Sequence, residues 1–188
     1  MFPIEIFTYP NGRKGVGIYK CGYQSTKSIC PNSIPHPGLQ REPLNRKDIL
    51  QFNEPLLFPF RDPVKRFISA VDTVKKNKKY DNYNIDDFLD GIEEKGDFRN
   101  LHFMESSIIL RNACYKFDHI QLYKFPDHYE QMLRDGGYEG DIPHKNKSIK
   151  KWTLTKSKEE RVRKYYAKDI EVFESIKNPG QPFYWLKI

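Results

Sequence analysis

The chain is predicted to form a single α/β domain over residues 1–188, because segments with the pattern of strands alternate along it with segments of helical spacing. Runs typical of strands occur at residues 16–19, 56–60 and 119–125, and the last long amphipathic segment covers residues 158–176. A length of 188 residues suits one domain with a substantial core. No repeat or domain boundary divides the sequence.

The N-terminal region reads as two strands followed by a loop that could hold a ligand. Residues 4–9 and 16–19 have strand patterns around the turn signal Pro10-Asn11-Gly12. A small and polar loop follows, and a short helix is expected to begin near Ser25. Residues 31–46 hold four of the 13 prolines, which excludes a long helix and favours a constrained loop at the lip of a site.

The segment around residue 61 has the pattern of a strand, a tight turn and an amphipathic helix. The apolar run ends abruptly at Arg61, Asp62 suits an N-cap, and Pro63 suits the first helical position. Ser69 follows two turns into the helix, on its polar side. Because open parallel sheets bind ligands at the carboxyl ends of their strands, Arg61 and Ser69 are placed to hold an anion.

The rest of the chain carries weaker signals of the same alternation. Further helices are predicted over residues 84–92, 102–112, 126–134 and 158–176. Ser157 and Glu160 form a capping box for the last of them. Gly136-Gly137 is expected to end the third.

Composition and charge favour a soluble protein with an anionic partner. The formal charge is +7 and the pI is about 9.2, which suits a nucleotide, an acidic glycan, nucleic acid or a membrane surface. Three cysteines form no CxxC pair and are expected to be reduced, and no His/Cys cluster has zinc-ligand spacing. Neither a signal peptide nor a membrane-spanning run is recognisable, so a cytoplasmic location without a membrane span is expected.

Two stretches have the form of phosphate sites, each with a plainer alternative. The loop after residue 19 would offer backbone N–H groups, the Lys20 ammonium and the hydroxyls of Ser25 and Thr26. It lacks the GxxxxGK[ST] pattern of a Walker A loop and could be an ordinary strand-to-helix turn. Arg61 could instead be an ion-pair partner in a purely structural turn.

Residues 61–70 resemble the R-D-P-x-x-R-x-x-S-A segment of sulfotransferases, especially the carbohydrate-modifying branch. The resemblance implies a P-loop-like sulfotransferase fold, in which a central parallel β-sheet is flanked by helices. It also implies that Arg61 and Ser69 hold the 3′-phosphate of 3′-phosphoadenosine 5′-phosphosulfate (PAPS). The family loop K-x-G-x-[ST]-[ST], which binds the 5′-phosphosulfate, corresponds here to Lys20, Cys21, Gly22, Tyr23, Gln24 and Ser25, followed by Thr26.

Later segments give supporting similarity, so that the resemblance spans residues 14–175. Residues 101–106, 117–125 and 144–148 are similar to the family's H-x-x-x-Q helix start, a later strand and an N-x-S loop. The family's Y-x-x-D-x-x-x-F ending is matched by Tyr166, Asp169 and Phe173. The chain departs from the family pattern at Tyr19 (usually proline), Gln24 (usually a hydroxyl), Ser106 (usually Gln) and Lys124-Phe125 (usually acidic).

Sulfuryl transfer requires a base for the acceptor hydroxyl and a cation at the departing phosphate. The resemblance assigns the cation to Lys20. For the base, His36 is favoured, then Glu42, because the family carries a His or Glu between the two motifs; His102 is a further candidate. Each of these could instead be a solvated or structural residue. Lys65 and Arg66 are expected to face solvent.

The predicted function is transfer of a sulfuryl group from PAPS to an acceptor hydroxyl, with a carbohydrate as the favoured acceptor and 3′-phosphoadenosine 5′-phosphate (PAP) as the product. The alternative is a basic α/β module that binds nucleic acid or a polyanionic glycan without chemistry. Nucleic acid is not the expected partner. A kinase-like transferase is disfavoured by the missing Walker motif.

Overall fold

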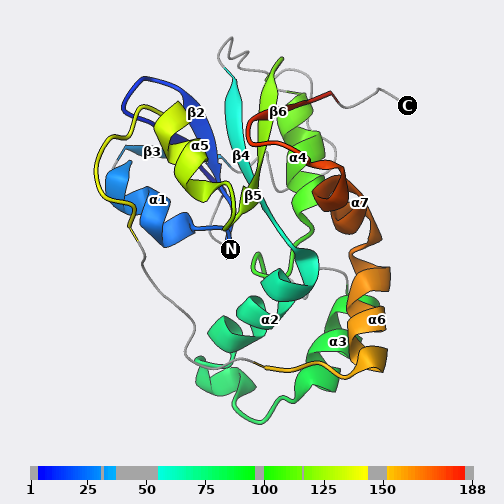
Figure 1. Cartoon of the computed structure of the whole chain (residues 1–188). Helices are drawn as coiled ribbons and strands as arrows, with labels where there is room; N and C mark the ends of the chain where they lie inside the picture. The colour runs from blue at the N-terminus through cyan, green and yellow to red at the C-terminus, as the bar shows by residue number, and fades with distance from the viewer. Residues whose placement is uncertain are drawn as a thin grey trace.

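A six-stranded mixed sheet lies at the centre of the protein, in the order β3-β1-β2-β4-β5-β6 (Figure 1). This computed structural model describes residues 4–30, 32–36, 55–95, 100–115, 117–143 and 152–184. The strands are β1 (Ile4–Thr8), β2 (Lys14–Gly17), β3 (Ser33–His36), β4 (Leu56–Arg61), β5 (Ile120–Phe125) and β6 (Gln181–Phe183). The helices are α1 (Tyr23–Ile29), α2 (Pro63–Val74), the 3-10 turn η3 (Lys78–Tyr80), α3 (Ile85–Lys95), α4 (Ser106–Cys114), α5 (Tyr129–Asp135), α6 (Lys156–Tyr165) and α7 (Ala167–Ser175).

The prediction of an α/β fold is confirmed, whereas the prediction of a parallel sheet holds for the three strands β2, β4 and β5. The outer strands β1, β3 and β6 pair in antiparallel fashion with their neighbours. Strands β1 and β2 are antiparallel because only residues 9–13, with a turn at Gly12 (φ +88°), connect them, and so short a connection can join antiparallel strands but not parallel ones. Strands β3 and β6 were not predicted.

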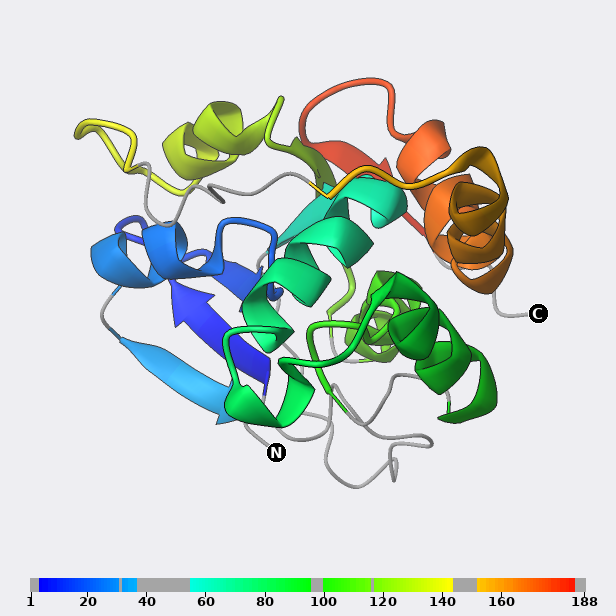
Figure 2. The ribbon, with the colours of Figure 1, turned by 90° about the horizontal axis from the view of Figure 1, so that it is seen from below.

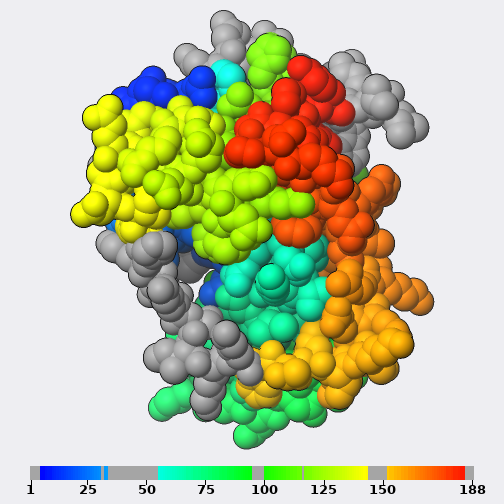
Figure 3. All heavy atoms as spheres, viewed as in Figure 1, coloured from blue at the N-terminus to red at the C-terminus, as the bar shows by residue number. Residues whose placement is uncertain are grey.

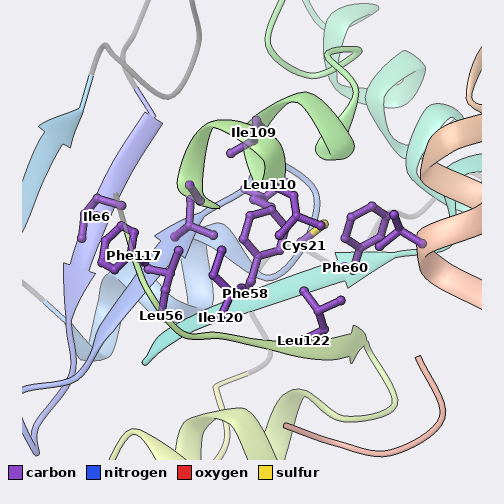
Figure 4. Close-up of a cluster of buried hydrophobic side chains, with 14 of the residues drawn as sticks. Ile6, Cys21, Leu56, Phe58, Phe60, Ile109, Leu110, Phe117, Ile120 and Leu122 are labelled. Carbon is purple, nitrogen blue, oxygen red and sulfur yellow. The ribbon is translucent and has the colours of Figure 1, made fainter. Parts of the chain in front are cut away.

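Alternate residues of the central strands bury their side chains on opposite faces of the sheet. On one face, Phe58 and Phe60 of β4 and Leu122 of β5 pack against Leu110 of α4 (Figure 4). The other face carries a second core with α1 and α5, which includes Phe7, Leu57, Tyr123, Met132 and Leu133. The alternation explains why β4 is a continuous apolar run: both of its faces are covered.

A separate helical layer extends beyond the carboxyl ends of the parallel strands. Helices α2, α3 and α6 lie together there, at the bottom of Figure 1 and in the foreground of the view from below (Figure 2). Their core includes Phe67 and Val71 of α2, Phe88 and Ile92 of α3, and Val162 of α6. Helix α2 therefore connects the end of β4 to a layer that faces the loop after β2.

The predicted helices differ from the structure in their bounds, most of all the last one and the one expected over residues 102–112. The last amphipathic segment is two helices, α6 and α7, which break at Tyr166. The N-cap is Thr155, whose hydroxyl accepts a hydrogen bond from the Lys158 N–H at 3.4 Å, so the predicted capping box at Ser157 and Glu160 is wrong. Helix α4 begins at Ser106 and not at residue 102, because the preceding residues form a turn.

None of the helices in the described part of the chain is both long and apolar enough to cross a membrane.

Asp62 is the N-cap of α2. The Asp62 carboxylate accepts a hydrogen bond from the Lys65 N–H at 2.9 Å, and Pro63 occupies the first helical position. Replacing Asp62 by Ala leaves that donor unsatisfied and should lower the free energy of unfolding by about 1 kcal/mol. Urea denaturation measures the loss. Asp62→Asn is the matched control, because Asn caps equally well; equal losses in both variants would contradict the role of the cap.

Candidate anion-binding site

The loop between β2 and α1 turns sharply because two of its residues have left-handed backbones. Lys20 has φ +69° and Gly22 has φ +80°. A Cβ atom on Gly22 would lie 2.8 Å from the Tyr129 ring and 2.9 Å from the Phe125 ring, so both the backbone and the packing require glycine there. A lysine in this region is uncommon, and such residues concentrate at functional sites. Helix α1 then begins at Tyr23, two residues before the predicted start.

Arg61 ties this loop to the end of β4. Its Nη1 donates a hydrogen bond to the Lys20 carbonyl oxygen at 2.8 Å, and its guanidinium carbon lies 5.7 Å from the centre of the Phe125 ring. Phe125 ends β5 and pairs in register with Arg61. The carboxyl ends of all three parallel strands therefore meet around one guanidinium, as the edge geometry predicted.

The Lys20 side chain reaches across to α2. Its Nζ donates a hydrogen bond to the Thr73 hydroxyl, which in turn donates to the Ser69 carbonyl oxygen at 3.2 Å. Lys20 is thus linked to the end of β4 through Arg61 and, through Thr73, to the backbone of α2 at Ser69. Thr73 was not predicted; its place one helical turn after Ser69 was the signal that could have found it.

Several cationic side chains lie close together at this edge of the sheet. Burial, with further contributions from Arg61 and Lys76, lowers the pKa of Lys20 to about 8, while Asp72 acts in the opposite direction. Burial also lowers the pKa of Arg61. Among the described residues, no acid forms a salt bridge with either side chain. A bound anion would relieve this electrostatic cost.

Arg61 and Ser69 each have a polar side-chain atom without a hydrogen-bond partner in the described part of the chain. Arg61 Nε is buried and has no hydrogen-bond partner there. Ser69 is only 8% exposed, and its hydroxyl makes no hydrogen bond to a described residue. Buried polar atoms of this kind are normally satisfied, so both are available to a ligand.

The other loop residues have different surroundings. Cys21 lies in the core facing α4 (Figure 4), and burial raises the pKa of its thiol to about 11, so that the thiol stays protonated and unreactive. Gln24 is exposed and Tyr23 half-buried. Thr26 is buried, and its hydroxyl lies 3.0 Å from the Tyr129 hydroxyl. The Tyr129 hydroxyl also hydrogen-bonds with Ser25.

Tyr129 was not predicted as part of this region. Its hydroxyl donates weakly to the Gly22 carbonyl oxygen at 3.5 Å as well as contacting the two hydroxyls of α1. The predicted hydroxyl donors of the loop therefore face the β5–α5 segment. Figure 3 shows a hollow in the surface between this segment (green-yellow) and α2 (cyan). Blue atoms of the N-terminal region are visible deep inside the hollow.

The three candidate bases lie in different places relative to the loop. His36 is the last residue of β3, and its backbone lies at the same edge of the sheet as the end of β2. Strand β1 separates the two, so the distance between β3 and β2 is about 10 Å. Glu42 lies outside the described residues. His102 lies beside the loop: its ring packs on Tyr19, with 4.8 Å between ring centres.

The expectation that Arg66 faces solvent is wrong, whereas Lys65 is exposed as predicted. Arg66 is 1% exposed, and its Nη2 pairs with Asp169 Oδ2 at 3.3 Å. The Asp169 carboxylate also accepts the N–H groups of Ser106 at 2.9 Å and Ser107 at 2.7 Å, at the start of α4. The pair therefore links α2, α4 and α7 behind the loop. Arg66 faces inward because α7 covers this face of α2. The spacing of apolar residues along α2 cannot reveal that contact.

Comparison with known protein families, with curated proteins and with solved structures finds no match to this chain.

Loss of the buried carboxylate should be strongly destabilising. Asp169→Asn leaves the Arg66 charge buried without its partner, which costs about 3–5 kcal/mol of unfolding free energy. Urea denaturation of the purified variant measures it. Lys168→Ala is the matched control: that side chain is 70% exposed in a surface pair with Glu171, and its loss should cost no more than about 1 kcal/mol. Similar midpoints for the two variants would rule out this role for Asp169.

Proposed function

We propose that this chain is a PAPS-dependent sulfotransferase, which transfers a sulfuryl group to an acceptor hydroxyl, with a carbohydrate as the favoured acceptor class. The observation that carries the proposal is the pair of cations Lys20 and Arg61 at the carboxyl edge of three parallel strands, neither of which forms a salt bridge with a described residue. These are the residues that the sulfotransferase resemblance assigns to the two ends of the donor. A P-loop-like sulfotransferase fold is part of the proposal.

The residues at the site fit a ligand with two anionic groups. Arg61 Nε and the Ser69 hydroxyl, which have no hydrogen-bond partner among the described residues, suit the 3′-phosphate. The Lys20 ammonium and the backbone N–H groups between β2 and α1 suit the 5′-phosphosulfate. When bound, PAPS supplies the activated sulfuryl group.

Each residue then has a defined task in the transfer. Lys20 stabilises the charge that develops on the departing phosphate oxygen, since its ammonium is partly buried and charge interactions there are stronger than in water. Arg61 holds the loop in place through the Lys20 carbonyl while it binds the other end of the donor. Thr73 gives the ammonium a resting partner in the free protein.

The central test compares PAP with adenosine 5′-monophosphate, which lacks the 3′-phosphate. PAP should raise the melting temperature of the protein at lower concentrations, because a ligand that binds the folded state alone stabilises it by mass action. Ser69→Ala should weaken PAP binding about tenfold or more, since a hydrogen bond to a charged group is lost, and leave the monophosphate response unchanged.

Controls separate binding from folding. Lys65→Ala, an exposed position on the same helix, should bind PAP like the unmodified protein, and Arg61→Lys keeps the charge but loses the Nε donor. Equal, salt-sensitive responses to PAP, the monophosphate and heparin would instead favour the non-catalytic polyanion-binding module.

The depressed pKa of Lys20 predicts a pH dependence of PAP binding. Below about pH 8 the Lys20 amine is protonated and attracts the anion; above it the free protein loses this charge. The dissociation constant should therefore rise by up to about tenfold per pH unit above pH 8 until the pKa of the bound state is reached. Phosphates, with a second pKa of about 6, do not titrate there.

Isothermal calorimetry from pH 7 to 9.5 measures this dependence. Lys20→Arg is the control, because the guanidinium stays charged throughout the range. A constant affinity across the range for the unmodified protein would contradict the assignment of Lys20 to the anion site.

A further inference from the structure

His102 lies where it could serve the reacting end of the proposed site. It belongs to the turn that precedes α4, which is closed by a hydrogen bond from the Phe103 N–H to the Asn100 carbonyl oxygen at 2.9 Å. Its half-buried ring packs on Tyr19, the residue directly before Lys20. The imidazole is therefore next to the part of the loop that presents the Lys20 ammonium.

Asn100 determines which nitrogen of the ring carries the proton. Asn100 Oδ1 accepts the backbone N–H of His102 at 3.0 Å, which identifies this atom as the oxygen of the amide, because the amide nitrogen cannot accept. The same oxygen lies 2.8 Å from His102 Nδ1. Nδ1 must then be the donor, and in the neutral ring Nε2 carries the lone pair.

The surroundings keep that lone pair available. None of the described residues hydrogen-bonds with Nε2. Burial, together with the charges of Lys20 and Arg66, lowers the pKa of His102 to about 4, so the ring is neutral at pH 7. The nearby acids Glu105 and Asp169 interact with Arg66 and with each other.

We propose that His102 Nε2 takes the proton of the acceptor hydroxyl, with Asn100 as the positioning residue that holds the required tautomer. The inference rests on the proposed function. As the hydroxyl oxygen bonds to sulfur, its proton moves to Nε2. The bond between sulfur and the 5′-phosphate oxygen breaks, and its electron pair stays on that oxygen beside Lys20. The products are a sulfate ester, PAP and one proton on the imidazole.

This arrangement couples the base to donor binding. In the free protein the Lys20 ammonium acts against protonation of His102. An anion bound at Lys20 offsets that charge, so the pKa of His102 should rise when the site is filled, while burial, the largest cause of the shift, still holds it below its ordinary value. The imidazole then becomes a stronger base in the state that needs one.

The experiment combines a spectroscopic titration with turnover. NMR of the ¹⁵N-labelled protein, with the His102 signals assigned by their loss in His102→Gln, should show the Nδ1–H tautomer in the free protein and a rise in its pKa with PAP. His102→Gln should bind PAP as before but release PAP from PAPS about 10²–10⁴-fold more slowly, with water and with desulfated heparin as acceptors. His119→Gln, an exposed histidine, is the control. Asn100→Ala should lose the tautomer preference and part of the rate.

The outcomes separate the inference from the function on which it rests. Absence of PAP binding to the unmodified protein would overturn both. PAP binding with an unshifted His102 signal, or with rates within about threefold of normal in His102→Gln, would overturn the inference alone. Loss of rate in His36→Gln but not in His102→Gln would move the role to His36.

Discussion

The hydrogen bond from Arg61 to the Lys20 carbonyl oxygen is the interaction on which the candidate site depends. It joins the end of β4 to a loop that contains two left-handed residues, and so fixes the backbone from which the Lys20 ammonium extends. It acts together with the packing of Cys21 against Phe58 and Phe60 of β4. One guanidinium thus sets the separation between the two cations that the proposed donor would bridge. It also stays partly unsatisfied, because its Nε has no partner among the described residues.

A second buried arginine holds the scaffold behind this loop. Arg66 on α2 pairs with Asp169 on α7, and the same carboxylate satisfies the first N–H groups of α4. Carboxylates are favourable at a helix N-terminus, and a buried guanidinium needs a partner, so one aspartate meets two requirements. The turn that carries His102 immediately precedes α4. The position of the imidazole against Tyr19 therefore depends on the same network.

The sequence predicted the parts of the fold that local chemistry determines. Asp62 and Pro63 predicted the start of α2, and the apolar run before them is a strand buried on both faces. Strands β3 and β6 escaped prediction, because pairing between distant segments leaves little trace in a short run such as residues 181–183. The inward orientation of Arg66 was missed for a similar reason: its partner lies 103 residues away. Lys20, Arg61 and Ser69 could be proposed from the sequence because their motifs are local, whereas Thr73 and Tyr129 contact the loop only through the tertiary fold.

A crystal structure of the protein with PAP would test the central claim most directly. The 3′-phosphate is expected within hydrogen-bonding distance of Arg61 Nε and the Ser69 hydroxyl, and the 5′-phosphate at Lys20, with the Lys20–Thr73 hydrogen bond released. PAP bound elsewhere, for example along the exposed lysines after α2, or a site that stays empty at saturating PAP, would contradict it.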